Sequence, residues 1–147
     1  MTKAIYFDMD GTIADFYGVD GWLEYLMNED ITPYAKAIPL IRFCTLARVL
    51  NRLQKEGWHI GIVSWLSKSG SEEYNKRVTE TKVKWLEKHL PSVKWNEVVI
   101  VNYGTPKGTV VRNPQGILFD DEEQNRTNWV GNAYDEKNIM GVLKAIA

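Results

Sequence analysis

The sequence predicts an α/β fold, a three-layer Rossmann-like sandwich in which helices cover both faces of a central parallel sheet. Short apolar runs at 4–7, 59–63, 98–101 and 116–119 are typical of strands that are buried on both faces. Longer segments with apolar residues at helical spacing separate these runs, and glycine, proline and polar clusters mark the turns. Strands that alternate with helices in this way pair in parallel.

The chain begins with a strand and a short insertion. The run at 4–7 leads into an acidic turn that contains glycine, so the first strand is expected to stop there. In the insertion, at about 15–39, Asp20 is expected to cap a short helix, which ends in the polar stretch that runs up to Pro33. Because the insertion is too small for a domain of its own, residues 1–147 are expected to form one domain with a minimal cap.

The next segment predicts a helix followed by the second strand. Its apolar residues keep helical spacing as far as Gly57, a residue type common at helix ends. These residues are Phe43, Leu46, Ala47, Leu50 and Leu53. Cys44 is expected on the same apolar face, as a core residue. It is the only cysteine and has no internal disulfide partner, which fits a reducing compartment.

The second half of the chain continues the alternation. Ser69 and Glu72 have the pattern of a capping box for a helix that ends near Pro91. A strand follows, then a loop rich in glycine and proline at 104–115, and then the strand that ends at 119. Asp135 is expected to cap a last helix. The apolar residues of that helix are Ile139, Met140, Val142, Leu143 and Ile146.

Composition limits the classes of function. The chain has 147 residues, 44% of them hydrophobic and 25% charged, as expected for one globular domain with a core. Its net charge of −1 argues against stable binding of long nucleic acid, although a local basic group could still hold one phosphate. No apolar segment has the length of a signal peptide or a membrane span, so the sequence predicts a cytoplasmic protein with no membrane partner.

The segment Asp8-Met9-Asp10-Gly11-Thr12 is the most informative part of the sequence. It follows the first strand directly and carries two carboxylates beside a glycine turn. Open α/β sheets bind ligands at the carboxyl ends of their strands, so these carboxylates are candidates for a ligand or metal site. Taken alone, the two aspartates also fit an ordinary turn after a strand.

Further polar residues follow at intervals along the chain. Ser64 comes after the second predicted strand, Lys107 lies in the glycine- and proline-rich loop, and Asp120 and Asp121 follow the last apolar run. Each has an ordinary interpretation when taken singly. The serine fits a turn or helix cap, the lysine a solvated side chain, and the acidic pair the first turn of a helix. Their order along the chain is what points to function.

In that order, these groups resemble the motifs of the haloacid dehalogenase superfamily of phosphatases. The motifs are D-x-D-G-T, a serine or threonine after the second strand, a lysine, and a terminal acidic pair. The resemblance covers nearly the whole chain. Within the superfamily, the segments 8–16 and 118–121 are most similar to the 5′(3′)-deoxyribonucleotidase branch and its small bacterial and phage relatives.

The resemblance implies a magnesium-dependent phosphate monoester hydrolase. It makes Asp8 the nucleophile that forms an aspartyl-phosphate, and Asp10 the general acid and then the general base. It implies that Thr12, Ser64 and Lys107 contact the phosphoryl group of the substrate.

The implied cofactor is Mg²⁺, because carboxylates this close to a phosphate repel it unless a divalent cation lies between them. Its ligands would be Asp8, the backbone carbonyl of Asp10, and Asp120. Asp121 would act on the metal through water or from a second layer of contacts. The sequence leaves open which residue of the acidic pair binds directly.

The implied substrate is a small phosphate ester, in the first place a nucleotide. Aromatic residues of the insertion, together with Trp65, are candidates for stacking on a nucleobase, although most could equally form the core of the cap. Those of the insertion are Phe16, Tyr17, Trp22 and Tyr25. So small a cap leaves the site open to larger esters, or a second copy of the chain completes the pocket.

Other functions remain open at this point. A sugar phosphate or the phosphorylated 3′ or 5′ end of a nucleic acid is an alternative substrate. A signalling receiver domain also uses an aspartyl-phosphate, but its acceptor follows a later strand. A phosphate-binding module without activity is the remaining alternative.

Overall fold

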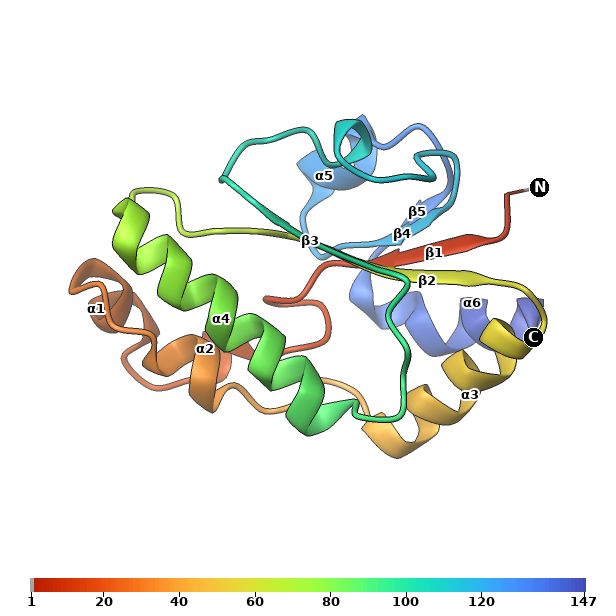
Figure 1. Ribbon diagram of the computed structural model, residues 1–147, viewed down its shortest axis with the longest axis horizontal. Helices are drawn as coiled ribbons and strands as arrows, with labels where there is room; N and C mark the ends of the chain where they lie inside the picture. Colours follow the sequence, from red (N-terminus) through yellow and green to blue (C-terminus); the bar gives the residue numbers. More distant parts are fainter. Residues whose placement is uncertain (1) are drawn as a thin grey trace.

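The computed structural model describes residues 2–147 and contains a five-stranded sheet. Its strands are β1 (Ala4–Phe7), β2 (His59–Trp65), β3 (Glu97–Val101), β4 (Ile117–Phe119) and β5 (Ala133–Tyr134). They lie in the order β3-β2-β1-β4-β5 and every neighbouring pair is parallel (Figure 1). The predicted α/β class and parallel sheet are therefore confirmed, and β5 is a short strand that the sequence did not indicate.

Helices flank this sheet in a Rossmann-like arrangement. The α-helices are α1 (Trp22–Met27), α2 (Thr32–Lys36), α3 (Phe43–Lys55), α4 (Glu72–His89), α5 (Glu123–Asn128) and α6 (Ile139–Ile146). The 3₁₀ turns are η1 (Phe16–Gly18), η2 (Lys107–Thr109) and η3 (Glu136–Asn138). Helices α3, α4 and α6 lie on one side of the sheet, and α5 lies on the other with the segment between β3 and β4 (Figure 1).

Alternation of side chains along the strands divides the core between these two sides. Ile5 and Phe7 of β1 pack into the larger apolar cluster, together with residues of α3, α4 and α6. Ala4 and Tyr6 point the other way, into a smaller cluster that contains Trp129. Because both faces of β1 are covered, this strand is fully buried, as its continuous apolar run predicts.

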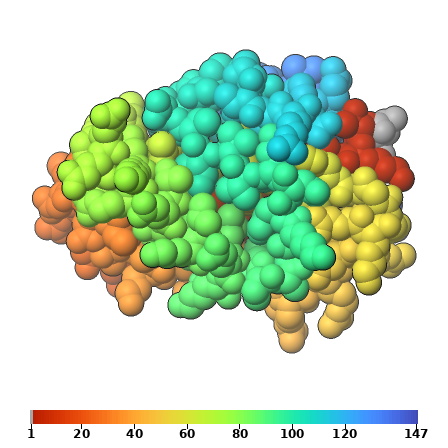
Figure 2. All heavy atoms as spheres, in the orientation of Figure 1, coloured from red at the N-terminus to blue at the C-terminus, as the bar shows by residue number. Residues whose placement is uncertain are grey.

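The insertion lies beyond the carboxyl ends of the strands. In the ribbon, η1, α1 and α2 stand beside α4 at one end of the molecule (Figure 1). The space-filling view shows the orange atoms of this segment and the green atoms of α4 forming the left end of the molecule (Figure 2). A third cluster of buried side chains joins them, including Phe16, Tyr34 and Tyr74. The cap is thus attached to the main body through its own small core.

The ends of two helices differ from their prediction. Ser71, rather than Ser69, accepts a hydrogen bond from the Tyr74 amide and begins α4. Gly21 occupies the N-cap of α1 with a left-handed φ of 78°, so Asp20 does not cap that helix. Pro33 stands in the first turn of α2, because a proline without an amide hydrogen fits where that hydrogen has no partner in the helix.

The end of α3 follows its prediction, whereas the position of Cys44 does not. Gly57 has a φ of 94°, and the amides of Gly57 and Trp58 close a Schellman motif on Gln54 and Leu53. Cys44 is exposed instead of buried. At 3.6 residues per turn, it lies about 160° around the helix from Leu46, which is in the core.

No helix within residues 2–147 combines the length and apolar character that crossing a membrane would require.

Candidate active site

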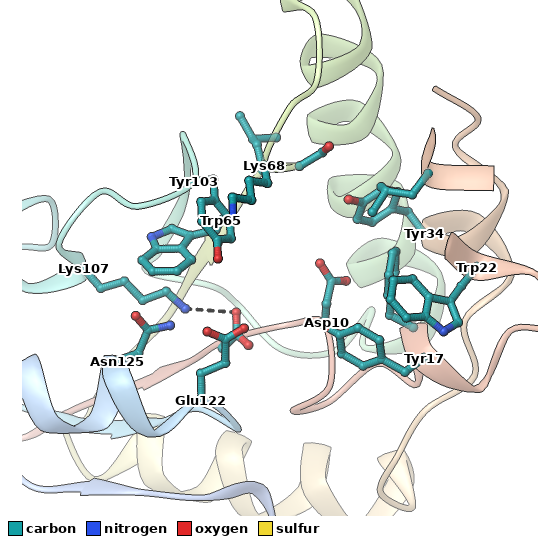
Figure 3. A pocket seen from close by; sticks show the side chains of 15 residues that line it. Asp10, Tyr17, Trp22, Tyr34, Trp65, Lys68, Tyr103, Lys107, Glu122 and Asn125 are labelled. Atoms are coloured by element: carbon teal, nitrogen blue, oxygen red, sulfur yellow. Dashed lines mark hydrogen bonds and ion pairs between the residues drawn. The ribbon is translucent and has the colours of Figure 1, made fainter. Parts of the chain in front are cut away.

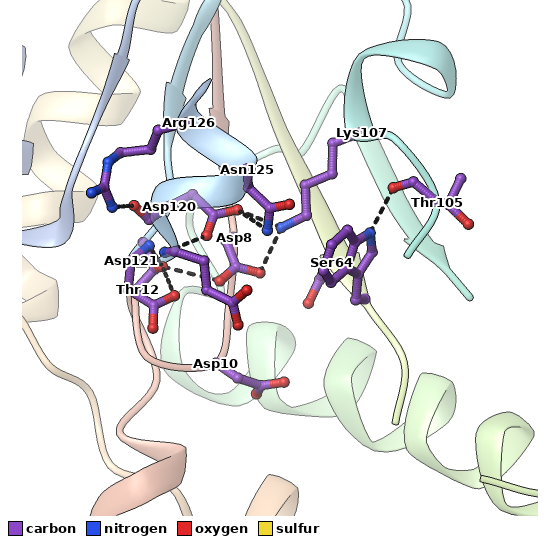
Figure 4. A network of polar contacts seen from close by, with 12 residues as sticks. Asp8, Asp10, Thr12, Ser64, Thr105, Lys107, Asp120, Asp121, Asn125 and Arg126 are labelled. Carbon is purple, nitrogen blue, oxygen red and sulfur yellow. Dashed lines mark hydrogen bonds and ion pairs between the residues drawn. The ribbon is translucent and has the colours of Figure 1, made fainter. Parts of the chain in front are cut away.

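The carboxyl ends of three neighbouring strands bring the predicted polar residues together. Asp8 follows β1, Asp120 follows β4, and Ser64 is the last residue but one of β2 (Figure 4). Ser64 is therefore part of its strand rather than a turn or helix cap after it. Because β1 lies between β2 and β4, these side chains meet at one edge of the sheet.

The turn after β1 is shaped by Gly11. The carbonyl of Met9 accepts hydrogen bonds from the amides of Thr12, Ile13 and Ala14, at 3.0 to 3.1 Å. Gly11 has a φ of 81°, which a side chain disfavours, and a Cβ atom there would collide with the carboxylate of Asp121. Glycine thus lets the turn double back and lets the acidic pair approach it.

Lys107 links the two sides of the site. Its ammonium lies 3.0 Å from Asp8 Oδ1 and 2.6 Å from Asp120 Oδ2, and its side chain is only 3% exposed. Burial lowers the pKa of Lys107, but the two carboxylates outweigh this and hold it above its usual value. Lys107 is therefore a permanent cation between Asp8 and Asp120, and not a solvated surface lysine.

A partly buried polar network fixes the segment that carries Lys107. Glu97 of β3 accepts hydrogen bonds from the Tyr6 hydroxyl at 2.7 Å and from the backbone amide of Arg112 at 3.0 Å. The Tyr6 hydroxyl in turn accepts from the amide of Asn113 at 3.0 Å. Since β1 and β3 hold the segment in this way, Lys107 reaches the site from a loop that is anchored and not free.

Three carboxylates form a group that could hold a metal ion. Asp8, Asp120 and Asp121 each offer an oxygen within 4.8 Å of the others. The Thr12 hydroxyl lies 3.1 Å from Asp8 and 3.2 Å from Asp121, and it accepts a hydrogen bond from the Asp121 amide. Hard oxygen donors with this much negative charge fit a divalent cation of the Mg²⁺ type. The Asp10 side chain points away from these three carboxylates and toward Lys82, so its carboxylate is not a member of this group.

The pKa values of Asp120 and Asp121 reflect the burial of this group and its concentrated negative charge. Burial, and then the charge of Asp8, raise the pKa of Asp120 to about 6 and that of Asp121 to about 8. Lys107 opposes the rise at Asp120. A cation placed among these oxygens would relieve the repulsion, so the donor set favours a metal.

Lys82 of α4 is a buried site residue that the sequence analysis missed. Its side chain is 1% exposed, and its ammonium lies 3.0 Å from Asp10 Oδ2. Burial raises the pKa of Asp10, and Lys82 opposes this rise. One signal was available in the sequence: Lys82 stands four residues from both Val78 and Leu86, on the buried stripe of the helix.

A pocket of about 320 Å³ opens above these groups. Tyr17 and Trp22 of the insertion stand on one side of it, and Trp65 and Tyr103 on the other (Figure 3). The Trp65 indole is held in place by its hydrogen bond to the Thr105 carbonyl at 2.7 Å. Two aromatic walls thus face each other across the carboxylates.

The candidate aromatic residues therefore differ in role. Phe16, Tyr17, Trp22 and Trp65 all line the pocket, but Phe16 is only 3% exposed and packs on Tyr34 in the core of the cap. Tyr25 is not among the residues of 2–147 that line the pocket.

Sequence comparison adds no relative to this description. No protein-family model matches the chain, and no curated protein matches it.

Proposed function

We propose that this protein is a magnesium-dependent phosphate monoesterase that acts through an aspartyl-phosphate, with nucleoside monophosphates as substrates. One observation carries the proposal: the Asp8 carboxylate lies in a pocket between a buried lysine and two further aspartates, with Asp10 two residues away. A phosphate ester needs a nucleophile, positive charge on its oxygens and a proton for its leaving group, and the site has a candidate for each.

Asp8 is the nucleophile in this proposal. Its Oδ1 is paired with Lys107, and its Oδ2 faces the Thr12 hydroxyl, so the carboxylate is held rigidly. Attack on phosphorus forms the Asp8–phosphate bond and breaks the ester bond, whose electron pair leaves on the substrate oxygen. Asp10 gives its proton to that oxygen. Burial raises the pKa of Asp10 and so eases its protonation, while Lys82 opposes this rise.

The second half of the reaction reverses the role of Asp10. Now ionised, it takes a proton from water, whose oxygen attacks phosphorus and releases Asp8 and inorganic phosphate. Lys107 and the Ser64 hydroxyl would donate to the phosphoryl oxygens as charge shifts onto them. Bound Mg²⁺ would offset the charge of these oxygens, with Asp8, Asp120, Asp121 and the backbone carbonyl of Asp10 as the residues that hold it.

Mg²⁺ should bind more tightly as pH rises. Asp120 and Asp121, with pKa values raised to about 6 and about 8, must lose their protons before they bind a metal. Calorimetry in two buffers of different ionisation enthalpy should show about one proton released per Mg²⁺ near neutral pH, and almost none well above the pKa of Asp121. Asp121→Asn should weaken binding, and Asp20→Asn, an exposed aspartate in the insertion, should not. Affinity that does not change with pH would argue against these ligands.

Nucleotides suit the pocket better than other small esters. Its aromatic walls offer stacking surfaces for a base, and it is lined by few further charged groups on the side of the insertion. A receiver domain stops at the phosphorylated aspartate, whereas Asp10 beside Asp8 gives this site the group that hydrolysis needs.

A panel of phosphate esters tests both the class and the substrate. With Mg²⁺ present, we expect phosphate release from deoxynucleoside monophosphates at least about tenfold faster than from sugar phosphates, because base stacking contributes about 1–3 kcal/mol. Trp22→Ala should raise KM for the nucleotides alone. Leu23→Ala, at an exposed neighbouring position, is the matched control.

Three other results would change the assignment. Equal rates for both classes would remove the role of the aromatic walls. Faster release from phosphorylated oligonucleotide ends would make these the substrate. An absence of release from every ester would leave a phosphate-binding protein without activity.

A further inference from the structure

Lys82 of α4 connects two groups of the site that lie on different strands. Its ammonium lies 3.0 Å from Asp10 Oδ2, which follows β1. It donates to the Ser64 hydroxyl of β2 at 2.8 Å and to the Trp65 carbonyl at 2.7 Å. One buried cation from the helix layer therefore contacts both Asp10, the proposed general acid, and Ser64, the proposed hydrogen-bond donor to the phosphoryl group.

These contacts use the whole donor capacity of the lysine. An ammonium carries three protons, and its three partners are one carboxylate, one hydroxyl and one carbonyl. Since the Ser64 oxygen accepts from Lys82, its own proton points elsewhere and is available to another acceptor. The geometry thus sets the direction in which Ser64 can donate, as well as the place of its oxygen.

Lys82 is not placed to touch a substrate. The pocket is lined by Asp10 and not by Lys82, among the residues that the structure describes. The Lys82 side chain is 1% exposed, whereas that of Asp10 is 19% exposed. The ring of Tyr34 lies 5.3 Å from the ammonium and further shields it. Any effect of Lys82 on a reaction must therefore pass through Asp10 and Ser64.

Burying a lysine is expensive unless its charge is paired and its protons are bonded. A helix needing only to pack on the sheet would place an apolar residue here, as α4 does at Val78 and Leu86. The charge has one carboxylate within ion-pair distance, and that carboxylate faces the pocket. This placement is explained if the position of Asp10 matters.

We propose that Lys82 is a positioning residue that fixes the Asp10 carboxylate for proton transfer to the leaving group. This inference rests on the proposed phosphatase function. It adds a second buried cation with a task separate from that of Lys107, since Lys107 contacts Asp8 and Asp120 whereas Lys82 contacts Asp10.

The leaving group distinguishes this role from a merely structural one. An alkyl phosphate needs a proton on its departing oxygen, whereas p-nitrophenyl phosphate releases p-nitrophenolate, which is a stable anion. General acid catalysis contributes about 10²–10⁴-fold, so Lys82→Met should slow the first step, measured as single-turnover release of the leaving group, by about 100-fold for an alkyl phosphate. The same variant should slow the single-turnover release of p-nitrophenolate by less than about threefold, because that step needs no proton, whereas kcat should fall for both esters because Asp10 is also the base of the second step. Lys84→Met, an exposed lysine of the same helix, should leave both rates unchanged.

A second variant covers the case in which Lys82→Met folds poorly because Asp10 loses its partner. Asp10→Asn/Lys82→Met leaves neither charge unpaired. If Lys82 acts through Asp10, this double variant should hydrolyse the alkyl phosphate within about threefold of Asp10→Asn, since the two residues act as a unit. Thermal unfolding of each variant reports whether it is folded.

The outcomes separate the two proposals. No hydrolysis of either ester by the wild-type protein overturns the phosphatase function, and the role of Lys82 with it. Wild-type hydrolysis with equal losses in the single-turnover rate of leaving-group release for the two esters in Lys82→Met overturns the role of Lys82 alone. So does a double variant whose loss is the product of the two single losses.

Discussion

Asp8→Asn should abolish phosphate release, with a loss of about 10⁴-fold or more, because an amide cannot form the acyl-phosphate on which both steps depend. The substitution keeps the shape of the side chain. Lys107 keeps Asp120 as a partner, 2.6 Å away, so no buried cation is left alone and the variant should fold. Asp20→Asn, on the exposed surface of the insertion, is the matched control and should retain full activity.

Trapping the intermediate makes this experiment specific to Asp8. After acid quenching, mass spectrometry should find a phosphorylated peptide that contains Asp8 in the wild-type protein and none in Asp8→Asn. Asp10→Asn should accumulate the protein phosphorylated on Asp8 from an aryl phosphate, because this variant has no base to activate the attacking water. Full turnover by Asp8→Asn would show that another group, or water itself, attacks phosphorus, and the mechanism would have to be abandoned.

The meeting of the polar residues was predictable because it follows from a parallel sheet. Asp8 and Asp120 come directly after apolar runs, and the carboxyl ends of neighbouring parallel strands share one edge. In a parallel sheet, a loop that crosses this edge is enough to bring Lys107 into contact with both carboxylates. The structure shows that contact at both carboxylates.

Lys82 could not be found in this way because helix residues carry no such marker. A lysine in a polar helix is exposed in most proteins, and its burial depends on what the helix lies against. Here α4 packs beside the insertion as well as the sheet, so its buried stripe includes a position that faces Asp10. Whether this lysine is buried therefore depends on the element that the helix packs against, and not on the helix sequence alone.

Errors at Cys44, Ser69 and Asp20 share one physical cause. Each prediction depends on the rotation of a helix, or on where it begins to within one or two residues, and the local sequence pattern does not determine either. Ser69 and Ser71 are equally good caps as residue types, and Glu29 selects the second by accepting hydrogen bonds from its amide and hydroxyl at 2.8 and 2.7 Å. That contact comes from the insertion, 42 residues earlier in the chain. Tertiary contacts therefore set the details that periodicity cannot.

Lys107→Met should destabilise the folded protein more than any other single change in the site. It leaves Asp8 and Asp120 buried with no cation between them, and breaking a buried pair by removing one partner costs about 3–5 kcal/mol. In a chain of this size, such a loss lowers the melting temperature by about 10 °C. Thermal unfolding without Mg²⁺ at neutral pH measures this, with the exposed Lys84→Met as the control.

The pH dependence of that loss identifies its cause. Asp120, with a pKa raised to about 6 even beside Lys107, takes up a proton in acid, and a neutral carboxyl needs no cation. The destabilisation should therefore shrink as pH falls through this range and grow as pH rises through it. Asp8→Asn/Lys107→Met should recover part of the stability, because one of the two facing charges is gone. A loss that is the same at every pH, with no recovery in the double variant, would mean that Lys107 stabilises the fold by packing and not as the central cation of the site.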